Sequence, residues 1–363
     1  MKYIAILSSG TGGHVYPAYT LSIKYIKKGY KIIWVGTNSG LENKVVKDQN
    51  IEIKHVKSQG IRGKSLFKKF FGLFYFLIAI VESFIIIKKY KPCLIFGFGG
   101  YVSVPGTISG FMLNIPVVTH EQNSIAGTAN KINYFLSKMI FETFPMSFNR
   151  QSNKIIHAGN PVRDNFNNLE SPESVYSNSK SQINILILGG SQGSLFFNNT
   201  LPFAISNFDN NNINIKHICG LNNQDIVKQK YLKYKINAEV LEFTNDIDRF
   251  FDWSTLVVCR AGSTSISEIA KIGRASILIP FPHATDNHQL INAQYLAQNS
   301  AAILLEQTDD FIENFITTIN ILLNDQKRFY ALAKNIQTIF PKNTTEIIIK
   351  NSLNLIKESS WKF

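Results

Sequence analysis

The chain has 363 residues, more than the roughly 250 to 300 at which one hydrophobic core stops growing, so two domains are expected. Its 45% hydrophobic and 17% charged residues exclude a disordered chain. The formal net charge of +13 favours anionic partners, and because no zinc-finger spacing or RNA-recognition signature accompanies it, a membrane surface or a phosphorylated ligand is favoured over nucleic acid.

The first half of the chain alternates short apolar runs with longer segments of helical spacing. The runs that predict strands are residues 3–7, 31–35, 94–96, 115–118 and 139–142. Strands that alternate with helices in this way predict a parallel sheet that is covered by helices on both faces.

Residues 66–91 form an unusually apolar segment. An apolar run, broken by Glu82 and Ser83, lies between Lys68-Lys69 and Lys88-Lys89-Tyr90-Lys91. A membrane-spanning helix is disfavoured, because the alternation requires a crossover helix here and an ionised carboxylate at mid-span is costly. We expect a helix with one face in the protein and the other on an anionic lipid surface; a core helix with solvated lysines is the alternative.

The second half repeats the alternation, with strands predicted at residues 183–188, 215–218, 239–241, 256–259, 276–279 and 302–304. The expected α/β fold therefore has two Rossmann-like, doubly wound domains facing a cleft. The expected bounds are 1–164 for the first domain, 165–182 for a linker rich in Asn, Ser and Pro, 183–340 for the second domain and 341–363 for a last helix that packs back on the body.

The three cysteines, at positions 93, 219 and 259, lie too far apart to predict a disulfide framework or a cysteine-based metal site. This pattern is typical of a reducing, cytoplasmic compartment. The N-terminus has one lysine and an apolar run that ends in glycines by Gly10, which is wrong for a signal peptide. We therefore expect the protein to stay in the compartment where it is made.

Two glycine loops, about half a chain apart, carry the main chemical signal. Gly10-Thr11-Gly12-Gly13-His14 follows the first predicted strand, and Gly189-Gly190-Ser191-Gln192-Gly193 follows the strand at 183–188. Each loop places backbone N–H groups and a helix N-terminus where an anion can approach. His14 is a candidate general base because imidazole titrates near neutral pH, although a histidine here can also simply cap the helix or contact phosphate.

Polar residues also follow other predicted strands. His120-Glu121-Gln122-Asn123 and the glycine-rich segment 97–106 do so in the first half, as do segments 259–268 and 280–289 in the second. Because ligands bind beyond the carboxyl ends of parallel strands, Glu121 and Asn123 are site candidates, with ordinary turn residues as the alternative. Segment 259–268 offers hydroxyls, N–H groups and a carboxylate, which suits a phosphate followed by a sugar diol.

Other ligand classes fit less well. A nicotinamide site is disfavoured because Val15 stands at the third glycine position and no acidic residue follows the strand at 31–35. The segment 60–65 is too short for an ATP-binding P-loop. His283, Asp286 and His288 suggest a metal site, but no second cluster completes it, so polar sugar contacts are expected, with no bound metal and no required cofactor.

Six motifs, in order along nearly the whole chain, resemble the MurG-type glycosyltransferase family, which acts on UDP-N-acetylglucosamine and lipid-linked muramyl pentapeptide. They are Gly10-Thr11-Gly12-Gly13-His14-Val15-Tyr16-Pro17-Ala18, Gly99-Gly100-Tyr101-Val102-Ser103, His120-Glu121-Gln122-Asn123, Gly159-Asn160-Pro161-Val162-Arg163, Gly189-Gly190-Ser191-Gln192-Gly193 and residues 260–268. The chain departs from the family at two places: Ser8-Ser9 stands where a further glycine is frequent, and Thr244 where some members have an aliphatic residue.

The resemblance implies a glycosyltransferase B fold, with UDP-N-acetylglucosamine bound mostly by the C-terminal domain and lipid I approached by the N-terminal one. Glu268 would contact the ribose hydroxyls, Ser191 and Arg163 would serve the diphosphate and its surroundings, and His14 and Glu121 would lie on the acceptor side. The implied donor contacts are Thr11, Gly12, Gly13, Asn123, Arg163, Ser191, Thr244, Ser263, Thr264, Ser265, Ile266, Ser267, Glu268 and Gln289.

The implied reaction is an inverting single displacement by the muramyl C4 hydroxyl that converts lipid I into lipid II, with His14 as the first candidate base and Glu121 as the second. The enzyme would act peripherally, on the cytoplasmic face of the cell inner membrane, in peptidoglycan synthesis, with 66–91 on anionic lipid. Two alternatives stay open. One is another sugar-nucleotide enzyme, such as a glycolipid galactosyltransferase or an N-acetylglucosamine epimerase. The other is a non-catalytic membrane-surface scaffold, which leaves the glycine loops unexplained.

Overall fold

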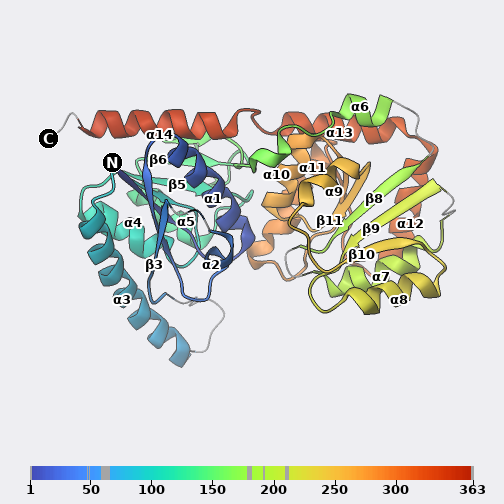
Figure 1. Cartoon of the computed structure of the whole chain (residues 1–363), viewed down its shortest axis with the longest axis horizontal. Coiled ribbons are helices and arrows are strands. Elements are labelled where there is room, and N and C mark those ends of the chain that lie inside the picture. The colour runs from blue at the N-terminus through green and yellow to red at the C-terminus, as the bar shows by residue number, and fades with distance from the viewer. Residues whose placement is uncertain are drawn as a thin grey trace. The chain divides into compact units, whose positions relative to one another are not determined.

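The computed structural model describes residues 2–46, 48, 50–58, 66–177, 182–190, 193–208 and 212–360, and for 66–71 and 359–360 it describes only the backbone. The chain forms two compact units. The first comprises Met1–Arg163 together with Asn343–Phe363, and the second comprises Asp164–Lys342. Each unit has its own sheet (Figure 1). Each also has its own hydrophobic core.

The first unit is built on a seven-stranded parallel sheet with the order β3-β2-β1-β4-β5-β6-β7. Residues 4–7 of the central strand are apolar and fully buried, as expected where helices cover both faces. The strand order reverses between β1 and β4, which is where open sheets of this kind bind ligands. The strands are β1 (Tyr3–Leu7), β2 (Lys31–Gly36), β3 (Ile51–His55), β4 (Leu94–Gly97), β5 (Val117–Glu121), β6 (Met139–Glu142) and β7 (Ile155–His157).

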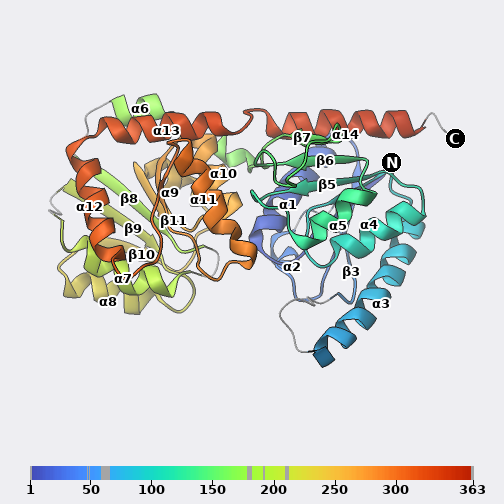
Figure 2. The same cartoon turned by 180° about the vertical axis from the view of Figure 1, so that it is seen from behind.

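Helices lie on both faces of this sheet. Leu21 of α1 and Ile348 of α14 join the core on one face, and Ala79 of α3 joins the core on the other. Helices α3 and α4 pack side by side (Figure 2). The helices are α1 (Gly12–Lys27), α2 (Glu42–Val45), α3 (Leu66–Tyr90), α4 (Ser103–Met112), α5 (Thr128–Leu136) and α14 (Thr344–Ser360).

The predicted last helix is α14, which packs on the first unit. Its Ser352 hydroxyl lies 2.5 Å from the Tyr25 hydroxyl of α1, and both side chains are fully buried. The expected apolar helix at 66–91 is α3. Within the part of the chain that the structure describes, no helix combines the length and the apolar character that crossing a membrane requires.

The second unit is built on a six-stranded parallel sheet with the order β10-β9-β8-β11-β12-β13. The strands are β8 (Ile183–Leu188), β9 (Ile213–Ile218), β10 (Ala238–Leu241), β11 (Leu256–Cys259), β12 (Ala275–Leu278) and β13 (Ile303–Leu304). The helices are η1 (Asp164–Phe166), α6 (Pro172–Ser177), α7 (Leu195–Ile205), α8 (Gln224–Lys233), α9 (Ile247–Trp253), α10 (Ser263–Ile272), η3 (Thr285–Asn287), α11 (His288–Gln298), α12 (Phe311–Asn324) and α13 (Lys327–Ile339).

The segment expected as a linker, 165–182, belongs to the second unit over its described residues. Phe166 is 2% exposed and packs on Phe251. The Tyr176 hydroxyl donates to the Thr255 carbonyl (2.7 Å) and accepts from the Ala275 N–H (2.9 Å). The polar composition suggested a solvated linker, but the two aromatic side chains anchor the segment to the body of the unit.

The predicted strands are present, with three differences at the first sheet. β5 begins and ends later than expected, so His120 and Glu121 are its last two residues and do not follow it. Strands β3 and β7 were not predicted. β3 mixes charged and apolar residues and β7 has three residues, so neither forms the apolar run that indicates a buried strand.

Candidate active site

In the first unit, the predicted residues gather beyond the carboxyl ends of the adjacent strands β1, β4 and β5. Gly10, with φ +97°, turns the chain after β1, and α1 begins at Gly12 with Thr11 as its exposed N-cap residue. After β4 the chain turns at Gly100, with φ +77°, where an added Cβ would lie 2.8 Å from the Ser9 carbonyl oxygen. The two loops therefore pack closely enough that their backbones touch.

His14 is connected to the end of β5 through two buried side chains. Its Nδ1 lies 2.8 Å from Oε1 of Gln122, whose Nε2 lies 3.0 Å from Nδ1 of His120. The other nitrogen of His120, Nε2, lies 3.0 Å from the Gly159 carbonyl oxygen. Burial lowers the pKa of His120 to about 4, so this imidazole is neutral at physiological pH.

Glu121 is fixed in the protein interior by hydrogen bonds to both carboxylate oxygens. Its Oε1 accepts from the Asn123 N–H (2.9 Å), and its Oε2 accepts from the Gly127 N–H (3.0 Å) and from Nδ2 of Asn130 (2.8 Å). The side chain is 1% exposed. Glu121 thus fixes the loop that follows β5, and it places half-buried Asn123 at the strand end.

Arg163 is the last residue of this part of the first unit. Its guanidinium lies over the Tyr16 ring of α1, 5.1 Å from the ring centroid. The contact places a cation beside the helix that carries Thr11, Gly12, Gly13 and His14.

In the second unit, the glycine loop after β8 leads into α7. Gly193, with φ +76°, packs so tightly that an added Cβ would lie 2.2 Å from the Cys219 carbonyl oxygen. Ser194 caps α7 by accepting from the Phe197 N–H (3.3 Å). Ser191, a predicted donor contact, lies outside the described residues.

Arg260, at the end of β11, ties this loop to the segment after β12. Its guanidinium donates to Oγ of Ser194 (2.8 Å) and to the carbonyl oxygens of Ile279 and Pro280, both at 3.1 Å. Burial lowers the pKa of Arg260 to about 10, which leaves it charged at neutral pH. Arg260 therefore holds three strand-end segments in one arrangement.

Helix α10 begins at Ser263, after a short turn that follows β11, and the first N–H groups of a helix have no partner within it. Ile266 is fully buried and its N–H donates to the Gly262 carbonyl oxygen. Ser267 donates to the Ser263 carbonyl oxygen (2.7 Å). The N–H groups of Ser263, Thr264 and Ser265 are the ones left for a ligand, and Glu268, in the same helix, is 5% exposed.

The remaining predicted contacts lie in the loop after β10 and at the start of α11, at the same edge of the sheet. Oε1 of Gln289 accepts from the Phe281 N–H (2.9 Å), and Oγ1 of Thr244 accepts from the Asp246 N–H (3.1 Å). Nδ1 of His288 donates to the Thr285 carbonyl oxygen (2.7 Å). Over the described ranges, no three His, Cys, Asp or Glu side chains form a group that could hold a metal ion.

Comparison with known proteins identifies the family. The model of the glycosyltransferase family 28 N-terminal domain matches residues 4–142, and that of its C-terminal domain matches residues 184–347. The UDP-N-acetylglucosamine–N-acetylmuramyl-(pentapeptide) pyrophosphoryl-undecaprenol N-acetylglucosamine transferase of Haemophilus ducreyi is 35% identical over 97% of this chain and 99% of its own. The chain belongs to glycosyltransferase family 28.

Solved structures agree with the placement in family 28. The crystal structure of Acinetobacter baumannii MurG is 29% identical, with a TM-score of 0.83 over 98% of this chain and 100% of that one. A UDP-GlcNAc 2-epimerase from Neisseria meningitidis, solved with UDP-GlcNAc, has a TM-score of 0.68 but 14% identity, so it shows the fold alone. The predicted resemblance to MurG-type enzymes and the two-domain glycosyltransferase B fold are confirmed.

Three side chains of this family 28 site were not predicted as site residues: Gln122, Ser194 and Arg260. Each lies inside or next to a motif that the sequence indicates, between or beside residues that were named. The available signal was a polar residue at the end of a buried strand. Spacing alone does not reveal that Gln122 contacts His14, because the two are 108 positions apart.

Proposed function

We propose that this family 28 chain transfers N-acetylglucosamine from UDP-N-acetylglucosamine to the C4 hydroxyl of the muramyl sugar of lipid I, and so forms lipid II with inversion. The observation that carries the proposal is the relationship, over 97% of the chain, to a transferase named for these substrates. The two strand-end sites support it, since one offers a basic side chain and the other offers N–H groups suited to a diphosphate.

In the proposed reaction, His14 is the general base. The C4 hydroxyl oxygen attacks the anomeric carbon as the bond from that carbon to the diphosphate oxygen breaks, and UDP leaves with the electron pair of that bond. His14 takes the hydroxyl proton. A positioned base typically contributes about 10²- to 10⁴-fold to the rate.

The second unit supplies most of the donor contacts in this proposal. The leaving diphosphate gains negative charge, and the first N–H groups of α10 and α7 are positioned to stabilise it. Glu268 then accepts from the ribose hydroxyls. Because helix N-termini can carry this charge, we propose that the reaction needs no bound metal or other cofactor.

Glu121 has a positioning role in this scheme. A base must reach the proton that it removes, and the Glu121 carboxylate is buried with donors on both oxygens. It keeps Asn123 and the loop to α5 in place. We therefore assign the proton transfer to His14 in preference to Glu121.

The test is incubation of the purified protein with labelled UDP-N-acetylglucosamine and lipid I. The expected product is labelled lipid II, with the β configuration at the new bond because the donor is the α anomer. Release of the 2-epimer without transfer would indicate an epimerase. Transfer from UDP-galactose to a glycolipid, with no lipid II formed, would indicate the galactosyltransferase alternative.

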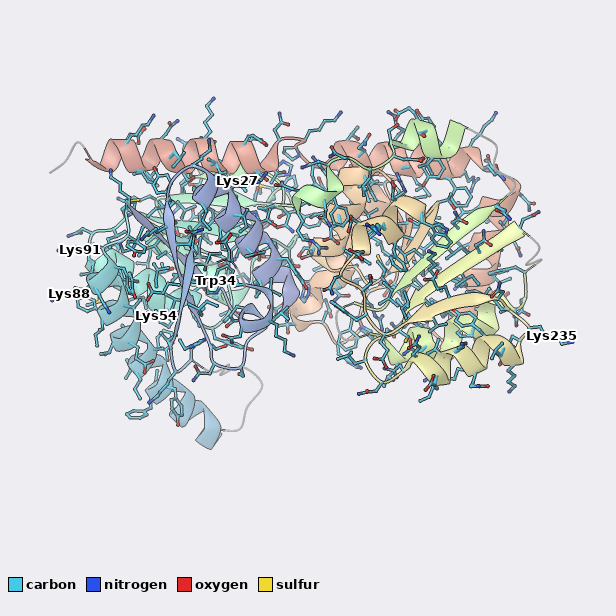
Figure 3. The ribbon with its side chains drawn as sticks, viewed as in Figure 1. Lys27, Trp34, Lys54, Lys88, Lys91 and Lys235 are labelled. Carbon is cyan, nitrogen blue, oxygen red and sulfur yellow. The ribbon has the colours of Figure 1, made fainter. Side chains whose placement is uncertain are left out.

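We also propose that α3 binds the enzyme to an anionic membrane surface. Its outer face carries apolar side chains spaced by one turn, and each is more than half exposed: Leu73, Leu77, Val81 and Ile85, with Phe74 beside them. Lys88 and Lys91 lie at the C-terminal end of this helix (Figure 3). Glu82 is turned to the protein, where its carboxylate accepts from the Lys57 N–H at 2.6 Å.

Vesicle binding tests the membrane proposal. Replacing both Leu77 and Val81 by Glu should weaken binding to vesicles that contain anionic lipid by about 10-fold or more, since burying one such side chain is worth roughly 1.5 to 3 kcal/mol. The matched control is Leu232→Glu on α8, which is similarly exposed, at 56%. Equal binding by the double variant and the control would contradict the proposal.

A further inference from the structure

Gln122 lies between two imidazoles and is itself fully buried. Its amide contacts His14 on one side, at 2.8 Å, and His120 on the other, at 3.0 Å. A primary amide has one end that only accepts hydrogen bonds and one that only donates. The orientation of this amide therefore decides which nitrogen of each histidine carries its proton.

Two backbone carbonyls fix that orientation. Nε2 of Gln122 lies 3.1 Å from the His120 carbonyl oxygen, which can only accept. The reversed amide would place two oxygens against each other, without a proton between them. Nε2 of Gln122 therefore donates to His120, and Nδ1 of His120 accepts. The proton of His120 is then on Nε2, where the second carbonyl, that of Gly159, accepts it at 3.0 Å.

The orientation of the Gln122 amide also sets the tautomer of His14. The group that faces its Nδ1 is the amide oxygen of Gln122, so Nδ1 must carry a proton. In the neutral ring, the lone pair is then on Nε2. A histidine that serves as a base needs its lone pair on the nitrogen that faces the hydroxyl, and this hydrogen bond keeps Nδ1 from being that nitrogen.

The ring is also held in position by packing. A Cβ added to Gly99, which has φ +92°, would lie 3.2 Å from Cε1 and 3.4 Å from Nδ1 of His14, so the β4 loop touches the ring edge. On the far side of Gln122, His120 stacks on the fully buried Phe98, with ring centroids 5.7 Å apart. His120 can accept from Gln122 because its burial keeps it neutral.

We infer that Gln122 is a positioning residue for the transfer reaction: it holds His14 in the Nδ1–H tautomer and leaves Nε2 free to take the proton of the attacking hydroxyl. His120 and the Gly159 carbonyl fix the Gln122 amide from behind. The catalytic consequence rests on the proposed function of His14, whereas the tautomer itself does not. In serine proteases a carboxylate fixes the catalytic histidine in the same way, and loss of the correct tautomer there is strongly deleterious.

The tautomer can be measured without any substrate. In the full-length protein labelled with ¹⁵N-histidine, two-bond nitrogen–proton correlation spectra distinguish the Nδ1–H ring from the Nε2–H ring. Seven histidines contribute signals, and the spectrum of His14→Gln identifies the His14 set by its absence. The expected result is an Nδ1–H ring at His14 and an Nε2–H ring at His120 in the unmodified protein above pH 7.

Two variants test the role of the amide. Gln122→Met removes the acceptor, so His14 should lose its preference for Nδ1–H, and kcat should fall roughly 10- to 100-fold while the KM for the donor changes less than about twofold. Gln122→Glu keeps an oxygen toward His14, so the Nδ1–H ring at His14 should persist, although its second oxygen then faces the His120 carbonyl and should lower the stability of the fold. The matched control is Thr119→Val, on strand β5 just before Gln122. It removes a buried hydrogen bond to Ser137 (2.7 Å) and should change neither the tautomer of His14 nor kcat.

The outcomes separate this inference from the proposed function. An Nε2–H ring at His14 in the unmodified protein, or an unchanged spectrum in Gln122→Met, overturns the inference whatever the enzyme transfers. A changed tautomer with unchanged kcat overturns the positioning role. If lipid II is not formed at all, the proposed function fails, and the spectra still decide whether Gln122 sets the tautomer.

Discussion

The two strand-end sites differ in the groups that form them. In the first unit the site consists of side chains that fix one another, since His14, Gln122 and His120 form one hydrogen-bonded chain and Glu121 holds the loop beside it. In the second unit it consists mainly of backbone, with a tightly packed glycine loop before α7 and the first N–H groups of α10.

This difference indicates that the first site serves proton transfer and the second serves donor binding. A chain of side chains can fix the proton on one chosen atom, which is what proton transfer requires. Oriented N–H groups cannot do this, but they bind an anion with little reorganisation. Substitutions in the first unit should therefore act mainly on kcat, and substitutions in the second mainly on the KM for the donor.

His14→Ala should have the largest effect. Removing the base should lower kcat by about 100-fold or more, while the KM for UDP-N-acetylglucosamine changes little. The measurement is steady-state transfer to a soluble lipid I analogue with each substrate varied in turn. Near-normal kcat with a raised donor KM would contradict the role of His14 as the base. It would also contradict the assignment of donor binding mainly to the second unit.

Gly193→Ala tests the backbone site. The added Cβ would clash with the Cys219 carbonyl, 2.2 Å away, and φ +76° disfavours any side chain, so the loop must move. We expect the donor KM to rise roughly 10- to 100-fold, with a smaller change in kcat.

Gly273→Ala is a matched control for this variant. It also has a left-handed glycine, φ +65°, and its Cβ would lie 2.4 Å from Cγ of Pro172, but it caps the C-terminus of α10, away from the glycine loop. It should lower the melting temperature and leave the donor KM unchanged. Equal donor KM values for the two variants would count against the second unit as the donor site.

The sequence predicts much of this arrangement because its signals are local. A buried parallel strand is an apolar run, and a glycine loop before a helix is a contiguous motif, so the strands on which the sites are built and the motifs at their ends can be found from sequence. Strands β3 and β7 lack that signal, since β3 alternates charged and apolar residues and β7 is very short.

The contacts that give these motifs their roles are not local. The carboxylate of Glu121 has the chemistry of a base, and its burial against Gly127 and Asn130 appears only when the loop is folded. In the same way, the polar composition of 165–182 predicts a linker, although Tyr176 anchors the segment. The hydrogen bonds of the Tyr176 hydroxyl depend on residues about 80 to 100 positions away. Tertiary packing overrides local composition at both places.

Acid stability should reveal a further respect in which the two units agree. Each buries a neutral histidine: burial lowers the pKa of His120, in β5, to about 4 and that of His217, in β9, to about 3. The unfolded chain takes up these protons below about pH 6.5, and the folded chain does not until much lower pH. The stability that they contribute is therefore complete above about pH 6.5 and is lost as the pH falls toward 4 and 3.

His217→Gln isolates the contribution of the second unit. The variant keeps an oxygen for the Tyr231 hydroxyl, which lies 3.1 Å from Nδ1 of His217, but it cannot take up a proton. Between pH 6 and 4, the free energy of unfolding measured with urea should fall less steeply with decreasing pH than in the unmodified protein, by about 1.4 kcal/mol per pH unit. His283→Gln, at an exposed position, should leave the slope unchanged. Identical slopes in all three proteins would mean that His217 is protonated or hydrated in the folded state, and the acid sensitivity would then rest with the first unit alone.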